Sequence, residues 1–240
     1  MSGHRLAIIA ALEREIRGLV KNWKVREQRH EGRSFKFYED GAGVLVCGGI
    51  GGEAARRASE AVVRLYQPEL LISAGFAGAL DSRLKVGEVF LPSRVIDGRD
   101  SSRTEITSGQ GTLISVASVA GPEQKSRLAD AYGAQAVDME AATVALVARR
   151  HELGFVAIKA ISDASDFELP PMDRFITSDG QFRTGAFAGF AAVRPWLWPR
   201  LARLSRNSGR ASQVLCSELG RYIRDAGRTN SQELQAISRV

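Results

Sequence analysis

Four short apolar runs constrain the fold of this 240-residue chain more than any other feature. Each run carries apolar residues on both faces, which is typical of strands buried between two layers of helices. Helical patterns separate the runs, and such alternation indicates a sheet with helices on both sides. The sequence therefore predicts an α/β protein, a single-domain three-layer α/β/α fold around a central, mixed, mostly parallel twisted sheet. The runs are residues 6–12, 44–47, 70–73 and 155–161.

The chain divides into a main α/β domain and a C-terminal extension. We assign residues 1–190 to the domain and residues 191–240 to a helical extension packed on it or trailing from it. Helical character begins near residue 186, and Pro195 and Pro199 should interrupt it. A polar stretch over residues 98–111 is predicted to be a mobile loop.

Composition excludes several classes of function. Cys47 and Cys216 give neither a disulfide framework nor metal-ligand spacing, and the three histidines are scattered, so we predict no metal and no cofactor. The first fifteen residues become charged too early for a signal peptide, and no apolar run approaches a membrane span. We therefore expect a cytoplasmic protein. The net charge of +6 is concentrated near the C-terminus, so we predict no nucleic-acid partner.

Two turns of small residues follow apolar runs. The first contains Gly49, Ile50 and Gly51, and the second contains Ala74, Gly75 and Phe76. Both should lie at the carboxyl ends of strands, where ligands bind in open α/β sheets. Glycines there allow a ligand to approach the backbone closely. The same residues also serve a tight turn or close helix packing, so each turn alone leaves both interpretations open.

Three carboxylates lie near the ends of the same runs. Glu15 follows the first run, Glu140 follows a short run at residues 135–137, and Asp163 follows the last. Each has a structural alternative, because acidic residues suit helix N-termini and Asp163 is a good helix cap. Together they predict one pocket in which one carboxylate binds hydroxyls and another handles a proton.

In combination the motifs resemble the nucleoside phosphorylase/nucleosidase superfamily, within it the methylthioadenosine/S-adenosylhomocysteine nucleosidases. The resemblance extends from about residue 5 to residue 168. It implies a nucleoside phosphorylase-like catalytic domain in which the N-glycosidic bond of a purine nucleoside of adenosine type is cleaved. The motifs that carry it are Ala11–Ile16, Gly49-Ile50-Gly51, Gly75-Phe76-Ala77-Gly78, Lys85–Val89, Val137-Asp138-Met139-Glu140-Ala141 and Ala160-Ile161-Ser162-Asp163.

The resemblance implies a role for each matching residue. Asp163 matches the acid that protonates purine N7, and Ser162 would orient its carboxyl group. Glu140 matches the residue that binds the ribose hydroxyls, while Met139 packs along the sugar. Glu15 matches the residue that activates water in the hydrolytic members. The resemblance also implies a homodimer.

The attacking nucleophile is predicted to be water. Phosphorylases of the superfamily hold phosphate with an arginine before the second glycine turn and a Ser or Thr within it, whereas this chain has Ser73 and Phe76 there. Glu15 would also repel a phosphate dianion. Phosphorolysis stays open through Arg56, Arg57 or an arginine of a partner subunit.

Two departures leave the 5′ substituent of the substrate open. The stretch from Asp97 to Leu113 is shorter than in the typical methylthioadenosine nucleosidases, and residues 115–119 lack the expected base-stacking ring. The segments 122–140 and 166–171 are similar to the hopanoid-associated phosphorylases, which remove adenine from the lipid nucleoside adenosylhopane. Residues 194–204 mix Trp, Leu and Arg, a composition that suits either peripheral contact with a membrane or an ordinary packed helix. A non-catalytic nucleoside-binding module is a further alternative.

Overall fold

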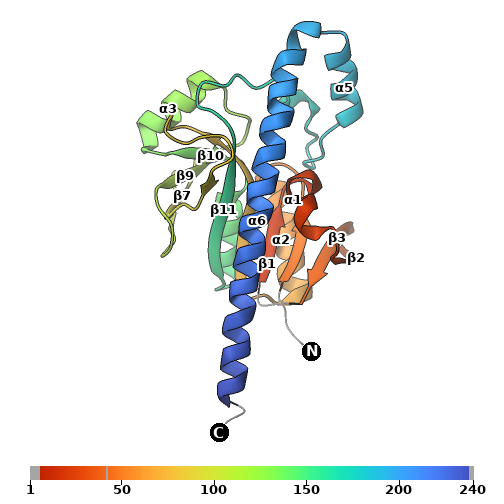
Figure 1. Cartoon of the computed structure of the whole chain (residues 1–240), viewed down its shortest axis with the longest axis vertical. Coiled ribbons are helices and arrows are strands. Elements are labelled where there is room, and N and C mark those ends of the chain that lie inside the picture. The colour runs from red at the N-terminus through yellow and green to blue at the C-terminus, as the bar shows by residue number, and fades with distance from the viewer. Residues whose placement is uncertain (1–5, 42, 238–240) are drawn as a thin grey trace.

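The computed structural model describes residues 6–41 and 43–237, with side chains as far as residue 226. A single mixed sheet forms its centre, and a long C-terminal helix runs the length of one face (Figure 1). The strands are β1 (Leu6–Ala10), β2 (Lys24–His30), β3 (Arg33–Asp40), β4 (Gly43–Cys47), β5 (Leu70–Ala79), β6 (Val89–Phe90), β7 (Arg94–Asp97), β8 (Arg103–Glu105), β9 (Thr112–Ser115), β10 (Ala136–Asp138) and β11 (Gly154–Asp163).

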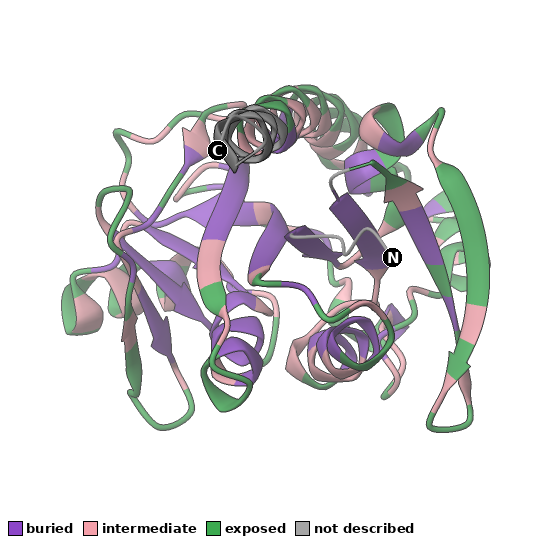
Figure 2. Cartoon of the chain, turned by 90° about the horizontal axis from the view of Figure 1, so that it is seen from below, coloured by how far each residue is buried: buried purple, intermediate pink, exposed green. Residues whose placement is uncertain are grey.

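Helices cover both faces of the sheet. Apolar residues of α1 and α6 pack on one face, and those of α2 and α4 pack on the other. Buried residues fill the space between these layers (Figure 2). The three-layer α/β/α fold predicted from the sequence is confirmed. The helices are α1 (Glu13–Val20), α2 (Gly52–Tyr66), α3 (Pro122–Tyr132), α4 (Ala141–Arg150), α5 (Thr184–Ala192) and α6 (Trp198–Ile237), with short 3-10 turns η1 (Asp173–Phe175) and η2 (Pro195–Leu197).

Parallel pairing is found at the centre of the sheet and antiparallel pairing mainly at its edges. The strand order is β2-β3-β4-β1-β5-β10-β9-β7-β8, and β11 pairs with β5 and β6. Strand β1 runs parallel to both β4 and β5, and all five of its residues are buried. The edge strand β2 is mostly exposed and carries charged side chains, which protect an open edge from pairing with other chains.

The connections of β5 create an opening in the sheet. On one side β5 pairs with β1 from Leu70 to Ser73, and then with β10 at Gly78 and Ala79. On its other side it pairs with β11 along almost its whole length. The stretch between Ser73 and Gly78 therefore has a neighbour on one side only. Ligands bind at such switch points of α/β sheets.

Helix α6 belongs to the core and also extends beyond it. Ala211, Leu215 and Leu219 recur at four-residue spacing and join the core cluster that contains α1 and β1. The first turns of α6 rise above the sheet beside α5 (Figure 1). Among the described residues, no helix has both the length and the apolar character needed to cross a membrane.

Two local expectations were wrong, and one strand was not predicted. Residues 103–105 of the expected loop form strand β8 on β7, where main-chain pairing compensates for polar side chains. Strand β2 was missed because its exposed residues lack an apolar alternation. Pro199 does not interrupt α6, since it is the second residue of the helix, where the missing N–H costs nothing.

Candidate active site

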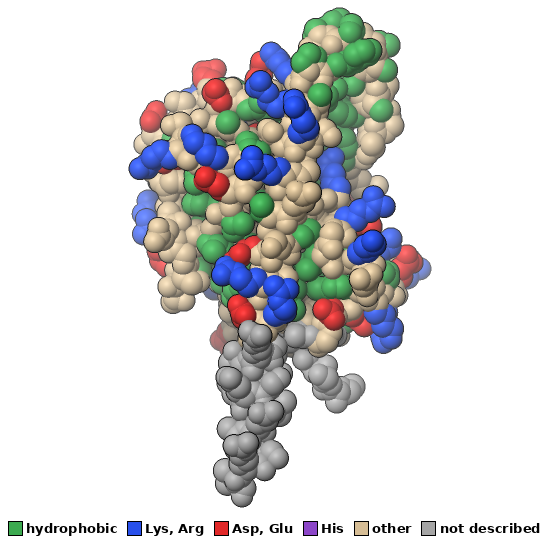
Figure 3. Space-filling model, in the orientation of Figure 1, with side chains coloured by type: hydrophobic (Ala, Val, Ile, Leu, Met, Phe, Trp, Pro, Cys, Tyr) green, Lys and Arg blue, Asp and Glu red, His purple; other side chains and the backbone are tan. Residues whose placement is uncertain are grey.

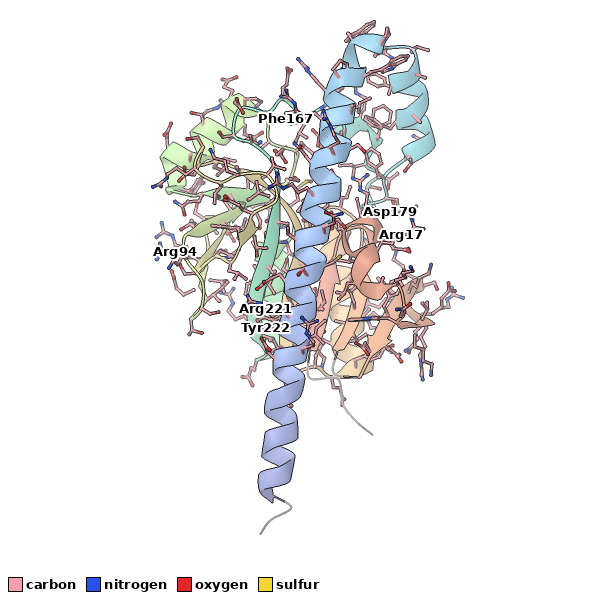
Figure 4. The ribbon with its side chains drawn as sticks, viewed as in Figure 1. Arg17, Arg94, Phe167, Asp179, Arg221 and Tyr222 are labelled. Atoms are coloured by element: carbon pink, nitrogen blue, oxygen red, sulfur yellow. The ribbon has the colours of Figure 1, made fainter. Side chains whose placement is uncertain are left out.

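A cavity of about 410 Å³ lies at the opening beside β5. Its polar wall comes from the carboxyl ends of β10 and β11 and from the start of α1. Its roof comes from the chain after β11. Two residues of this segment fix its position (Figure 4). Phe167 is buried beside α6, and Asp179 accepts a hydrogen bond of 2.8 Å from Arg33 at the start of β3. Glu15, Glu140 and Asp163 all line this one cavity.

Glu15 is buried in the first turn of α1. Its carboxylate accepts a long hydrogen bond from the backbone N–H of Leu12 at 3.4 Å. Burial raises the pKa of Glu15 to about 7, and the positive charge of Lys159 partly opposes the rise. A carboxyl group that titrates near neutrality is suited to accept a proton from water.

Glu140 caps the start of α4 and faces the same cavity. One carboxylate oxygen accepts a hydrogen bond of 2.7 Å from the backbone N–H of Gly51, so the first glycine loop holds this side chain. Burial, and after it the negative charge of Asp138, raises the pKa of Glu140. Met139 lies next to it and also lines the cavity.

Asp163 is buried at the end of β11. Ser162 donates a hydrogen bond of 2.6 Å to one carboxylate oxygen, the contact through which it would orient the carboxyl group. Lys125 donates to the other oxygen from the first turn of α3. Lys125 also lines the cavity, so the polar wall beside Asp163 contains a cation.

A second buried lysine supports the carboxylates from behind. Lys159, in the middle of β11, donates 2.9 Å to Asp138 and 3.0 Å to the hydroxyl of Ser73. Asp138 also accepts hydrogen bonds from Ser115 at 2.5 Å and from the backbone N–H of Ala141 at 2.9 Å. With its oxygens satisfied in this way, Asp138, which itself lines the cavity, holds Lys159 in place.

The glycine turns shape the site through their backbone. Gly49 donates to the carbonyl of Ala11 at 3.0 Å, so its N–H is committed to the end of β1. Gly75 has a φ of +152°, and a Cβ there would stand 3.1 Å from a Glu15 oxygen. Ile50 and Phe76 line the cavity. Ala74 is buried within β5 and packs in the core with α1 and α6.

The far half of the cavity is apolar. Its walls come from the roof segment, from α5 and from the upper part of α6. Phe182 and Phe187 pack edge to face with ring centres 5.3 Å apart, and Arg14 lies over the Phe182 ring. The cavity therefore extends from the carboxylates into an apolar space between α5 and α6. The apolar lining includes Met172, Phe182, Phe187, Leu201 and Leu204.

Sequence comparison identifies the family. Residues 5–115 and 99–178 match the phosphorylase superfamily. The chain belongs to this superfamily. A 5′-methylthioadenosine/S-adenosylhomocysteine nucleosidase of Staphylococcus aureus is 26% identical over 202 residues, which cover 68% of this chain and 88% of the relative. The superfamily predicted from the motifs is thereby confirmed.

Solved structures share the fold. The apo 5′-methylthioadenosine nucleosidase of Arabidopsis thaliana superposes with a TM-score of 0.68 at 19% identity and covers 93% of this chain and 97% of its own. Futalosine hydrolase of Helicobacter pylori superposes with a TM-score of 0.65 at 16% identity, with coverages of 90% and 97%. At these identities the likeness concerns the fold alone.

Several residues of the site were not predicted from the sequence motifs. Lys159 interrupts an apolar strand, and a charge in such a run is a signal of a buried ion pair. Lys125 gave no signal, because a lysine in the first turn of a helix is ordinarily solvated. Phe182 and Phe187, which line the apolar half of the cavity, were not singled out either, although four phenylalanines lie between residues 175 and 190.

Metal binding has no support in the described part of the chain. No group of three or more His, Cys, Asp and Glu side chains there is arranged to hold a metal ion.

Proposed function

We propose that this protein hydrolyses the N-glycosidic bond of an adenosine-type purine nucleoside that carries an apolar 5′ substituent. The observation that carries the proposal is the convergence of Glu15, Glu140 and Asp163 on one cavity. The nucleosidase relative supports the same reaction class. The apolar extension between α5 and α6 supports the apolar substituent.

Each carboxylate has a separate task in the proposed reaction. Asp163 delivers a proton to N7, which turns the purine into a better leaving group. The sugar develops positive charge as the C1′–N9 bond breaks, and the carboxylates of Glu15 and Glu140 favour that charge. Glu140 holds the ribose hydroxyls against Met139. Glu15 takes a proton from the water that attacks C1′.

The charges of the cavity favour water over phosphate as the nucleophile. Among the described residues that line it, the cations are Arg14 and Lys125. Arg14 stacks over Phe182 and Lys125 is bonded to Asp163. Arg56 and Arg57 both bind Glu53, at 2.9 Å and 2.7 Å, on the exposed face of α2. A phosphate dianion beside Glu15 would therefore meet a carboxylate without a free guanidinium to balance it.

The test is a panel of adenosine derivatives that differ at the 5′ position, incubated with and without phosphate. Free sugar and adenine are the expected products, at rates independent of phosphate. Sugar 1-phosphate formed only when phosphate is added would show phosphorolysis instead. Tight binding without turnover of any member would show a nucleoside-binding module.

Adenine removal from a lipid nucleoside such as adenosylhopane is the second candidate. Val193, Trp196 and Trp198 are exposed by 69%, 68% and 55% where α5 meets α6. Hydrophobic side chains gather at this end of the molecule, with Lys and Arg beside them (Figure 3). Exposed tryptophans flanked by arginines suit a peripheral contact with a membrane. Co-sedimentation with anionic vesicles, lost on Trp196→Ser and Trp198→Ser, tests that contact.

We also infer a homodimer, as the superfamily resemblance suggests, and a cytoplasmic location, as expected from the sequence. Light scattering across a range of protein concentrations tests the dimer. Cell fractionation tests the location. The division at residue 190 stays a proposal as well, although the packing of Ala211, Leu215 and Leu219 in the core supports an extension that lies on the domain.

A further inference from the structure

Lys125 is a buried cation that the mechanism above leaves without a task. Helix α3 lies wholly within the described residues, and Lys125 is its one buried residue, exposed by 1%. Its ammonium group donates to the Asp163 carboxylate and, at 2.7 Å, to the carbonyl of Ala164. The side chain lines the cavity beside Gly78 and Val119.

Attachment of α3 to the domain does not require this lysine. The helix already packs through Leu128, Ala129 and Tyr132 against the cluster around Ile114. Burying an ammonium group costs several kcal/mol before any partner offsets it, and apolar pairs of equal volume often stabilise a protein as well or better. A buried lysine aimed at the residue that protonates the substrate therefore indicates a chemical role.

The hydrogen bonds around Asp163 connect it to a proton donor. Ser162 donates 2.6 Å to one carboxylate oxygen, and the Lys125 ammonium group donates to the other. An ammonium group has three protons to donate, so Lys125 can pass one along its hydrogen bond to Asp163.

We propose that Lys125 is the proton source of the leaving-group site and that Asp163 relays its proton to purine N7. This inference rests on the proposed function. As the C1′–N9 bond breaks, its electron pair stays on N9. Asp163 gives a proton to N7 and receives one from Lys125, which becomes a neutral amine. Water bonds to C1′ and gives its proton to Glu15. After product release, Glu15 loses that proton and Lys125 regains one through solvent, so the cycle balances.

The test compares two leaving groups. An adenine nucleoside that the wild-type protein hydrolyses needs protonation at N7, whereas p-nitrophenyl β-ribofuranoside releases a stable phenolate without it. Lys125→Met should lower kcat on the nucleoside by about 100-fold or more, the usual effect of removing an acid. On the nitrophenyl riboside the loss should stay within about threefold. Arg127→Met removes an exposed cation from the same helix and should change neither rate.

Four outcomes decide the matter, with folding checked by circular dichroism and the melting temperature. An equal loss on both substrates would assign Lys125 to structure alone, and no loss on either would make it a bystander, so both results overturn the inference. If the wild-type protein accepts only the nucleoside, the rate of Lys125→Ala is measured with added ethylammonium. Recovery of the rate supports proton donation by Lys125, and no recovery refutes it. A wild-type protein inactive on every nucleoside would overturn the proposed function and this inference together.

Discussion

Lys159 and Asp138 form an ion pair closed to solvent, with Nζ 2.9 Å from Oδ2 and both side chains no more than 1% exposed. Asp138 lines the cavity together with Glu15, which is buried, and Glu140, which is half-buried. Lys159 lowers the pKa of both glutamates, while Asp138 raises the pKa of Glu140. One buried cation thus balances a group of carboxylates that the proposed reaction needs close together.

Replacing Lys159 should destabilise the protein and shift its activity toward higher pH. Lys159→Met leaves Asp138 as an unpaired buried charge, which costs about 3–5 kcal/mol in the free energy of unfolding. Without the lysine the pKa of Glu15 should rise above about 7. Urea denaturation and the pH–rate profile measure the two effects. Lys36→Met, at an exposed position of β3, is the control, and equal behaviour of the two variants would contradict the argument.

The rate of hydrolysis should rise with pH as Glu15 ionises. Its pKa is about 7, so the carboxylate that accepts the proton of water becomes the major form as the pH rises through about 7. Glu15→Gln should remove this rise and lower kcat by about 100-fold or more, as loss of a general base does. The exposed Glu13 begins the same helix, and Glu13→Gln should retain the wild-type profile. A wild-type rate that is flat between pH 6 and 8 would be inconsistent with this role for Glu15.

The same pKa predicts how stability depends on pH. Glu15 holds its proton up to about pH 7 in the folded protein, whereas its ordinary value is 4.5. Between these values the folded state binds more protons than the unfolded state, so this group's contribution falls as pH rises, by about 3 kcal/mol in total. Glu15→Gln should therefore gain stability relative to wild type from pH 5 to pH 8. Denaturation at a series of pH values checks this, and a constant difference would refute it.

Much of the fold follows from local pattern. The runs at β1, β4, β5 and β11 are apolar because these strands are covered on both faces, and their periodicity identifies them without knowledge of their partners. Strand β2 has an exposed face and no such pattern, so only its pairing with β3 reveals it. The neighbour of each strand, and hence the opening beside β5, depends on contacts far apart in the chain.

Only those residues of the site that belong to a sequence motif could be predicted. Glu15, Glu140 and Asp163 occur in recognisable segments, and the structure places all three at one cavity. Lys125 contacts Asp163 although the two residues are 38 positions apart in the sequence. The residues around each of them give no indication of this contact. The apolar half arises from the docking of α5 and α6 over the cavity, which no local pattern of residues 164–204 specifies.

Gly78 leaves space that the leaving-group site needs. A Cβ at this position would stand 2.9 Å from an Asp163 oxygen and 3.2 Å from Cε of Lys125. Gly78→Ala should displace both groups and lower kcat by about tenfold or more, because small misplacements of reacting groups are costly. Gly209→Ala is the control, since a Cβ there meets nothing within 4 Å. The measurement is kcat of both variants on the nucleoside that the wild-type protein hydrolyses fastest. An unchanged kcat in Gly78→Ala would contradict the need for space at this position.

Phe187 should determine how strongly an apolar 5′ substituent is bound. Its ring lines the cavity and packs edge to face with Phe175 and Phe182, each with ring centres 5.3 Å apart. Phe187→Ala should raise KM for 5′-alkylthioadenosines progressively with alkyl length, because each buried methylene contributes about 0.8 kcal/mol, while KM for adenosine should change little. Phe190 also packs on Phe175 but does not line the cavity, so Phe190→Ala controls for loss of packing. A KM increase independent of alkyl length would show that the substituent lies elsewhere.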